Sequence, residues 1–445
     1  MNRRHIRVID NIIMAVCLIS AAVISAGCDP FCGDISNDPP TPEEISRRNV
    51  LLLYSAGYNS LSQFLDSDVK DLKTGWLPGN AGADNILLVY KHNTAGYNNY
   101  MTHNSPNLIR LYRDKKGNVV SDTLMTYPEE TISSSARTLN EVLNFVKDEF
   151  PAKGYGLIFS SHATGYLPAG YYSNPTNYQY QEGPELFGTG IFSDPVPVPY
   201  VEVEHDPSLP MVKSIGEDHR KSGGGFISYE MELQDFADAI PMKLDYILFD
   251  ACLMGGIEVA YELKDKCRRI GFSQAEVLAE GLDYSTLTTH LLQNAEPDPQ
   301  GVCEDYFKQY DIESGVYRSA TISYIDCEML EPLAEVCRDL FSIHSNGISW
   351  IRPNNVQRFY RSDKHWFYDL ESIIFESGAT KEEISRLHDA LKGCVLYAAH
   401  TPTFMLEFEI NTFSGFSMYL PSNGSVELNK YYKTLKWNKA TGLVK

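Results

Sequence analysis

Two apolar segments of this sequence end in residues whose side chains could together perform nucleophilic catalysis. The run 156–161 (GLIFSS) leads into His162, and the run 246–250 (YILFD) leads through Ala251 into Cys252. A thiol is mostly protonated at neutral pH, and a nearby imidazole promotes the nucleophilic thiolate. If the two runs are neighbouring strands, about 4.8 Å apart, the two side chains meet at one edge of the sheet. We therefore predict a dyad of Cys252 and His162 in one open groove.

Each residue also has a simpler interpretation. A lone cysteine after an apolar strand is more often a buried structural thiol, and a lone histidine there is more often an ordinary hydrogen-bonded side chain. What favours catalysis is that Cys252 and His162 follow two consecutive apolar strands. A helix predicted over 253–266 would place the positive end of its dipole beside the thiol and favour the thiolate.

The elements that must position this pair alternate along the chain, which predicts an α/β/α sandwich with a mostly parallel central sheet. The strands are continuous apolar runs rather than alternating ones, as expected of strands buried on both faces. In such a sheet, functional residues gather at the carboxyl ends of the strands. The other predicted strands are 50–55, 85–90, 269–273 and 320–325, and the predicted helices are 60–72, 138–150, 229–239, 255–266, 300–310 and 328–344.

The chain divides into four predicted parts. Residues 1–28 form a signal segment, 29–47 a polar and Pro-rich tether, and 48–345 the main domain, which includes a long loop at 163–227. Loops of that length in compact domains are usually functional or mobile. Residues 346–445 are expected to form a smaller α+β region, with a helix over 381–396 and strand-like runs at 404–410 and 415–420.

The signal segment predicts export and lipid attachment. Arg3, Arg4 and Arg7 precede an apolar stretch, and the small residues 25–27 precede Cys28, which would be lipidated as in a bacterial lipobox. An ordinary cleaved signal or a short membrane anchor is the alternative. We expect the mature chain in the bacterial cell envelope, anchored to the outer membrane or cell surface.

Composition excludes several classes of function. The formal net charge of -20 disfavours nucleic acid as a partner. The nine cysteines include no CxxC pair, so neither a zinc site nor a disulfide framework is predicted. There is no phosphate-binding loop and no HExxH motif. We expect no cofactor, leave calcium dependence open, and expect a monomer.

Around Cys252 the chain resembles the clostripain-like cysteine peptidases, which have a caspase-like fold. The segment Asp250-Ala251-Cys252-Leu253-Met254-Gly255 is similar to the family's Asp-x-Cys-x-Met-Gly motif. The resemblance extends over roughly residues 48–440. Further matching segments are LLLYSAGYNSL, SQAE with GLDY at 273–284, FYDL at 367–370 and SGFSMYLP at 414–421.

The resemblance implies a role for each site residue. Cys252 would attack the peptide carbonyl, His162 would protonate the leaving amine, and the N–H groups of Cys252 and Ala163 would form the oxyanion hole. Asp250 would line a pocket for Arg or Lys before the cleaved bond, with Glu280 and Asp283 as candidates for a second carboxylate. The alternative for Asp250 is a cap of the following helix.

Ala163 and the segment that contains Arg220 and Lys221 bear on whether the enzyme is active and how it is activated. Ala163 stands where the family has Gly, and Ala resists positive φ, so the oxyanion hole could be altered. Arg220 and Lys221 lie in a segment expected to be exposed and flexible, and self-cleavage after either would fit the family's activation. The sequence thus predicts a cysteine endopeptidase acting on peptides or proteins after Arg or Lys. The alternatives are an inactive binding lipoprotein with the same fold and an envelope scaffold using the Tyr-rich loop.

Overall fold

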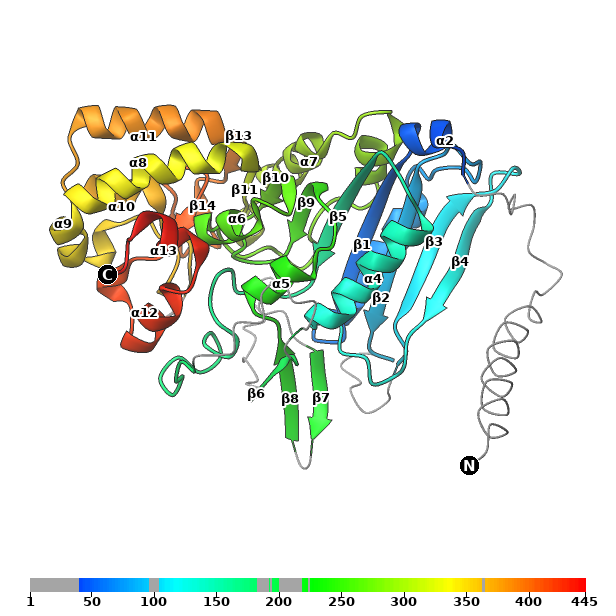
Figure 1. The fold of residues 1–445 in the computed structure, drawn as a ribbon, viewed down its shortest axis with the longest axis horizontal. Coiled ribbons are helices and arrows are strands. Elements are labelled where there is room, and N and C mark those ends of the chain that lie inside the picture. Colours follow the sequence, from blue (N-terminus) through cyan, green and yellow to red (C-terminus); the bar gives the residue numbers. More distant parts are fainter. Residues whose placement is uncertain are drawn as a thin grey trace, which may run out of the picture.

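The computed structural model describes residues 40–95, 104–181, 192, 194–199, 218–222, 225–361 and 365–445. Its centre is a nine-stranded sheet in the order β13-β11-β10-β9-β5-β1-β2-β3-β4 (Figure 1). The strands are β1 Asn49–Gly57, β2 Ile86–Asn93, β3 Asn107–Arg113, β4 Val119–Thr126, β5 Gly154–Ser160, β9 Leu244–Asp250, β10 Cys267–Phe272, β11 Thr321–Asp326 and β13 Val395–His400.

The core of this sheet is parallel, as predicted. β10, β9, β5, β1 and β2 run in one direction, and β3, β4 and β11 run against their neighbours. β1 and β9 are rich in Val, Leu, Ile and aromatic residues, and nearly all their side chains are buried, as in strands covered on both faces. All six predicted strands lie in the sheet, and the predicted fold class is confirmed.

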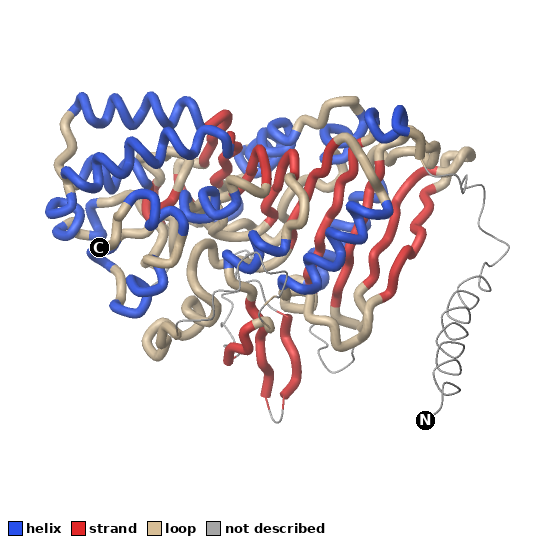
Figure 2. The backbone as a smooth tube through the Cα atoms, in the orientation of Figure 1, coloured by secondary structure: helices blue, strands red, loops and turns tan. Residues whose placement is uncertain are grey.

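Helices cover both faces of the sheet (Figure 2). On one face lie α4 Ala136–Glu149, α5 Leu233–Ala239 and α6 Ile257–Leu263, which are in front of the strands in Figure 1. On the other face, α3 Ser62–Thr74 packs on β1 and β2, and α7 Pro299–Asp311 packs on β10 and β11. The remaining helices are α2 Pro42–Arg47, α8 Leu330–Ile343, α9 Ser345–Trp350, α10 Leu370–Glu376, α11 Lys381–Cys394, α12 Val426–Tyr432 and α13 Lys436–Thr441, with short turns η1 Thr289–Gln293, η2 Gly315–Tyr317, η3 Cys327–Met329, η4 Pro353–Asn355 and η5 Pro421–Asn423.

The region after residue 345 supplies a strand to the central sheet. β13 pairs with β11, and the apolar core runs without interruption from β1 to Leu443. The strand expected over 404–410 is instead a hairpin of β14 Thr403–Phe404 and β15 Phe408–Glu409. Met405 and Leu406 have positive φ at its turn, which no extended strand allows. The other short pair is β12 Tyr368–Asp369 with β16 Ser417–Met418, and the division at residue 345 stays a prediction.

Part of the long 163–227 connection is folded. β6 Val196–Pro199, β7 Asp218–Ser222 and β8 Gly225–Glu230 form a small antiparallel sheet. It extends from the edge of the main sheet where the parallel strands end (Figure 1). The prediction of a flexible loop around Arg220 and Lys221 is therefore wrong for their backbone, which lies in β7.

The predicted signal segment and Cys28 lie outside the described residues. Of the predicted tether, residues 42–47 form the short helix α2, whose first turn is capped by Thr41 and Glu44. Within the described ranges, no helix is long and apolar enough to cross a membrane.

Candidate active site

The register of two central strands brings the predicted nucleophile and base to one edge. β5 and β9 are parallel neighbours, and Ser160 is the partner of Asp250 in this pairing. His162 and Cys252 each follow two residues later, so they leave adjacent strands at the same level. This is the edge formed by the carboxyl ends of the parallel strands, where active sites of such sheets lie.

Side chains at this edge are divided between two faces of the sheet because strand side chains alternate. Phe159 of β5 and Phe249 of β9 contact Phe236 of α5 on one face. On the other face, Ser160 donates a hydrogen bond to Asp250 at 2.9 Å. Burial, and after it the nearby Asp250 and Cys252, raise the pKa of the Tyr306 phenol on α7.

The thiol of Cys252 is fully buried. Its sulfur accepts a hydrogen bond from the backbone N–H of Val277 at 3.0 Å and lies 3.6 Å from the carbonyl oxygen of Val277. The chain after β10 is held there because the Leu253 N–H donates to the Ala275 carbonyl at 2.9 Å. The expectation of an open groove is therefore wrong for the sulfur: residues 275–277 cover it.

The imidazole of His162 has a partner that sequence reasoning missed. The Oγ of Ser60 lies 3.0 Å from His162 Nε2, and the histidine is only 4% exposed. Ser60 lies in the turn between β1, the strand beside β5, and α3, whose N-cap is Leu61. In the sequence, Ser60 is marked only by its position after the carboxyl end of a central strand. Tyr58 and Asn59 share that position, so the sequence could not identify Ser60 as the partner of His162.

The turn after Cys252 is strained, as turns at functional sites often are. Leu253 has φ of 62°, which is unusual for a bulky residue. A Cβ on Gly165 would lie 2.5 Å from the Leu253 carbonyl oxygen, so the loop after His162 can approach this turn only with glycine there. α6 starts at Ile257 rather than directly after Cys252. The predicted helix dipole at the thiol is therefore wrong.

Ala163 does not carry the strain that its substitution for Gly suggested. Among the described non-glycine residues, positive φ occurs at Leu253, Met405 and Leu406, and not at Ala163. The left-handed position of this loop is Gly165, with φ of 63°. An alanine at position 163 thus fits the backbone without the penalty that Cβ brings at positive φ.

Asp250 is fully buried and bound by hydroxyl groups. One carboxylate oxygen accepts hydrogen bonds from Ser160 at 2.9 Å and from Tyr284 at 2.7 Å. The first residue of α6 is seven positions further along, and its N-cap is Gly256. The alternative that Asp250 caps this helix is therefore wrong.

The two other acidic candidates line a hollow next to Asp250. Glu280 and Asp283 border it together with Asp68 of α3 and with Tyr284, the residue that binds Asp250. Its volume is about 370 Å³. Asp283 accepts hydrogen bonds from the backbone and side chain of Ser285 at 3.0 and 2.6 Å. The structure thus gathers Asp250, Glu280 and Asp283 around one tyrosine.

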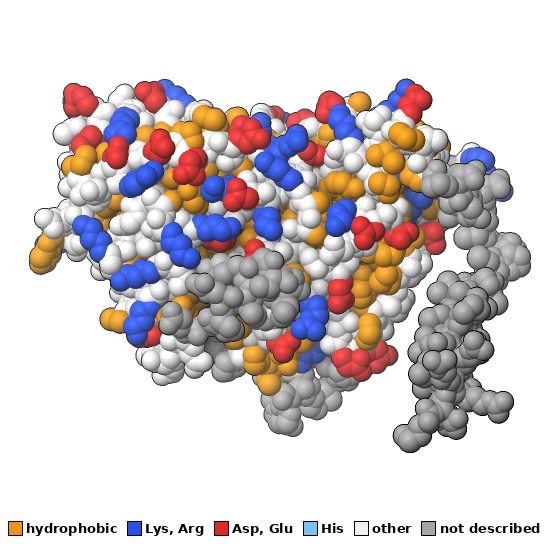
Figure 3. Space-filling model, in the orientation of Figure 1, with side chains coloured by type: hydrophobic (Ala, Val, Ile, Leu, Met, Phe, Trp, Pro, Cys, Tyr) orange, Lys and Arg blue, Asp and Glu red, His pale blue; other side chains and the backbone are white. Residues whose placement is uncertain are grey.

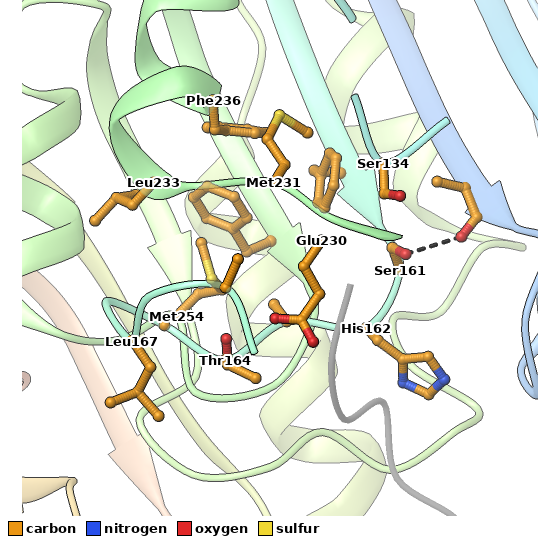
Figure 4. A pocket seen from close by; sticks show the side chains of 16 residues that line it. Ser134, Ser161, His162, Thr164, Leu167, Glu230, Met231, Leu233, Phe236 and Met254 are labelled. Atoms are coloured by element: carbon orange, nitrogen blue, oxygen red, sulfur yellow. Dashed lines mark hydrogen bonds between the residues drawn. The ribbon is translucent and has the colours of Figure 1, made fainter. Parts of the chain in front are cut away.

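An apolar cavity borders the same rim on the opposite face (Figure 4). His162, Thr164 and Glu230 lie at its polar end, and the side chains of Leu233 and Phe236 come from α5. The remaining lining residues are Ala56, Ser134, Phe159, Ser161, Ala163, Gly165, Leu167, Ala169, Met231, Phe249 and Met254.

Arg220 is fixed in place rather than exposed. Its guanidinium donates to the carbonyl of Thr131 at 2.6 Å and lies 4.2 Å from the ring centre of Tyr58. The neighbouring Asp218 is fully buried and accepts a hydrogen bond from the Ser133 N–H. Burial raises the pKa of Asp218 to about 6, although Arg220 opposes this shift. The backbone of Lys221 pairs with that of Phe226.

In the described ranges, the charged groups and cysteines outside this edge do not form a second candidate catalytic or metal site. On the face shown in Figure 3, acidic and basic side chains are interspersed despite the net charge. No group of three or more potential metal ligands occurs among the described residues. The six described cysteines are free and buried.

A sequence profile of the clostripain family matches residues 53–182 and 206–442. The chain belongs to the clostripain family. This clostripain-family chain is therefore a cysteine-type peptidase whose substrates are peptides or proteins. A search of curated proteins found no match.

Solved structures of clostripain-family proteases have the same fold. An inactive zymogen C11 protease from Parabacteroides distasonis is 25% identical, with a TM-score of 0.68 over 91% of this chain and 99% of that chain. A secreted C11 cysteine protease from Bacteroides thetaiotaomicron in complex with an irreversible peptide inhibitor is 23% identical, with a TM-score of 0.66 over 89% and 99%. A further structure of a secreted C11 protease from that organism is 21% identical, with a TM-score of 0.65 over 89% and 99%.

Proposed function

We propose that this chain is an endopeptidase that cleaves after Arg or Lys, with Cys252 as nucleophile and His162 as general acid and base. The observation that carries the proposal is the common level of His162 and Cys252 on the adjacent parallel strands β5 and β9. A family of cysteine peptidases needs one activated thiol. Of the six described cysteines, Cys252 follows the carboxyl end of a central parallel strand beside a histidine.

The reaction follows from these positions. The Cys252 thiolate attacks the peptide carbonyl carbon, and the N–H groups of Cys252 and Ala163 stabilise the negative oxygen of the tetrahedral intermediate. The C–N bond breaks as His162 gives a proton to the leaving amine, which leaves a thioester on Cys252. Water, deprotonated by His162, attacks the thioester, and the acid product leaves with the thiol restored.

Preference for a basic residue before the cleaved bond (P1) is supported by Asp250, Glu280 and Asp283. A guanidinium binds carboxylates through paired, charge-assisted hydrogen bonds. Asp250 is already bound by two hydroxyl groups, while Glu280 is exposed to solvent. We infer that Glu280 and Asp283 meet the cation first and that Asp250 fixes the depth of the pocket through Tyr284.

The covered thiol leads us to infer that the described state is a closed one. Residues 275–277 must move before a substrate carbonyl reaches Cys252, since the Val277 backbone occupies the space beside the sulfur. One similar solved structure is an inactive zymogen. Self-cleavage after Arg220 or Lys221 would be one route to opening, and it requires β7 to detach from β8 first.

A gel tests self-cleavage directly. The wild-type chain should convert to two fragments on incubation, whereas Cys252→Ala should stay intact. The double variant Arg220→Gln/Lys221→Gln should also stay intact. One intact chain for wild type with full peptidase activity would remove this step from the proposal.

The main experiment uses fluorogenic peptide amides that differ only at P1. Wild type should release the fluorophore from Arg and Lys substrates and not from Leu or Asp substrates. Cys252→Ala and His162→Ala should each lower the rate by roughly 10³-fold, because both groups act in the same steps. A folded wild type that cleaves none of the substrates, before and after limited trypsin treatment, would favour the inactive binding lipoprotein.

We further propose that the mature chain is a monomer anchored in the envelope through lipidated Cys28. The support is the lipobox-like segment before Cys28 and the polar stretch after it. Cells grown with an alkyne fatty acid should label the wild-type chain, and Cys28→Ala should abolish the label. Labelling that survives this substitution would contradict the anchor.

A further inference from the structure

Four of the large apolar side chains that line the cavity beside His162 come from three segments. α5 contributes Leu233 and Phe236, the segment before it contributes Met231, and the turn after the nucleophile contributes Met254. Figure 4 shows these four side chains gathered together, with His162 at the rim and directed away from them. Of the four, Met231 is half-buried and the other three are buried.

The cavity has the size and polarity of a site for one apolar side chain. Its free volume is about 60 Å³, which is the space of a few methylene groups. Among the described lining residues, the carboxylate is that of Glu230, which accepts a hydrogen bond from the Gly170 N–H at 2.8 Å. The half-buried residues Thr164, Gly165 and Met231 mark the side on which it reaches solvent.

The position of the cavity relates it to one residue of a substrate. Asp250 and the acidic hollow lie on the face of α3 and α7, whereas this cavity lies on the face of α5. A general acid must lie beside the nitrogen that leaves, and that nitrogen belongs to the residue after the cleaved bond (P1′). His162 lies at the rim of the cavity with its ring directed outward, so the P1′ side chain, which follows the leaving nitrogen, is the part of a substrate that can turn back into the cavity.

We propose that this cavity is the P1′ pocket and that it takes a compact apolar side chain, such as that of Leu or Met. The proposal rests on the proposed function, because it needs His162 as the general acid. A substrate then crosses the edge of the sheet, with its basic P1 side chain on one face and its apolar P1′ side chain on the other. The floor of the pocket includes Met254, two residues after the nucleophile.

Internally quenched peptides with Arg fixed at P1 and Leu, Met, Gly or Asp at P1′ test this with the full-length chain. Burial of one such side chain is worth about tenfold or more in specificity. We expect kcat/KM for Leu and Met to exceed that for Gly by about tenfold, and Asp to be the poorest. An arginyl aminomethylcoumarin substrate has no P1′ side chain, so it reports on the dyad and the P1 pocket alone.

The outcomes separate the two proposals. Cleavage of the coumarin substrate with equal rates for Leu, Gly and Asp at P1′ would overturn the P1′ pocket and leave the proposed function standing. Absence of cleavage of every substrate would overturn both. A preference for Arg or Lys at P1′ would also overturn the apolar pocket.

Two substitutions that change the volume of the cavity in opposite directions provide a second test. Ala169→Leu adds volume inside the cavity and should lower the ratio of Leu to Gly cleavage at P1′ to near one. Leu233→Ala enlarges the cavity and should shift the preference from Leu toward Phe. Ala399→Leu on β13 is a matched control far from the cavity and should leave the ratio unchanged. Equal ratios in wild type, Ala169→Leu and Leu233→Ala would contradict the pocket.

Discussion

The two faces of the sheet differ sharply at the edge where β5 and β9 end. On the side of α3 and α7, Asp250 is bound by the hydroxyl groups of Ser160 and Tyr284. On the side of α5, Phe159 and Phe249 contact Phe236 beside an apolar cavity. Each strand supplies both sides because its side chains alternate. A shift of one residue in either strand would therefore exchange the polar and the apolar side.

Two fully buried carboxylates sharpen the comparison. Asp250 lies on the first face, and Glu258 of α6 lies on the second, behind the turn that carries Cys252. Both accept a hydrogen bond from a tyrosine hydroxyl, Tyr284 at 2.7 Å and Tyr432 at 2.6 Å. Tyr284, the partner of Asp250, lines a hollow, whereas Glu258 also accepts a hydrogen bond from the Tyr419 N–H. We therefore expect Asp250 to serve substrate binding and Glu258 to serve stability.

The largest expected effect concerns Glu258. Burial raises its pKa to about 7 from 4.5, so the folded state holds its proton more tightly than the unfolded state. The stability from this group is present below pH 4.5 and is lost as pH rises through 7. Glu258→Gln should match wild type near pH 4.5 and be more stable by about 3 kcal/mol at pH 8. Urea unfolding of both chains between pH 4.5 and 8 measures this difference in the free energy of unfolding. A difference that does not change with pH would contradict the raised pKa of Glu258.

Asp250→Asn and Phe249→Leu compare adjacent residues on opposite faces. Asp250→Asn removes the negative charge behind Tyr284 and should lower kcat/KM for Arg at P1 by roughly 30-fold, since the attraction of two unit charges about 8 Å apart at an effective dielectric constant of about 20 is worth about 2 kcal/mol. Phe249→Leu should leave the ratio of Arg to Leu at P1 unchanged. If both substitutions changed this ratio equally, the two faces of the sheet would not differ in their contribution to P1 specificity.

Breaking a nearby ion pair should loosen residues 275–277, which cover the thiol of Cys252. Arg361 forms a two-point contact with Glu276, the residue between Ala275 and Val277, and also contacts Glu407. Arg361→Ala should free this segment and increase the rate of Cys252 alkylation by iodoacetamide several-fold. Arg386→Ala breaks an exposed pair with Asp339 and is the matched control. An alkylation rate equal to wild type would show that the pair does not hold the cover closed.

The smallest expected effect is at Ser60. Its hydroxyl contacts His162 Nε2 at 3.0 Å and helps to orient the ring. Ser60→Ala should lower kcat by about fivefold, within the 0.5–1.5 kcal/mol of one neutral hydrogen bond. The acid limb of the pH–rate profile should also move, which a purely structural role would not cause. Ser46→Ala on α2 is a control that should change neither.

The sequence predicted the parts of the fold that depend on long apolar runs. The runs ending at Ser55, Ser161 and Asp250 became central strands because burial on both faces demands such runs. β3 and β4 were missed because few of their residues are fully buried, so neither forms a continuous apolar run. β13 was missed because its residues are at most half-buried, and the helical pattern was extended over its start.

The site was predictable where it follows strand ends and unpredictable where it depends on loops. The common level of His162 and Cys252 could be predicted because two apolar strands lead to them, and the catalytic roles of these residues stay a prediction. The cover over the thiol depends on Val277, and the contact to His162 depends on Ser60. Neither has a local signal, because both arise from how turns after neighbouring strands pack against each other. The strand around Arg220 was obscured by the glycines that follow it.

Labelling with an arginyl acyloxymethyl ketone tests the central claim most directly. The reagent should attach to one site, Cys252, in the wild-type chain, and peptide mass spectrometry should locate it there. His162→Ala should label at least 100-fold more slowly, and free arginine derivatives should compete. A folded wild-type chain that does not label, or that labels at another cysteine at the same rate with and without His162, would contradict the account.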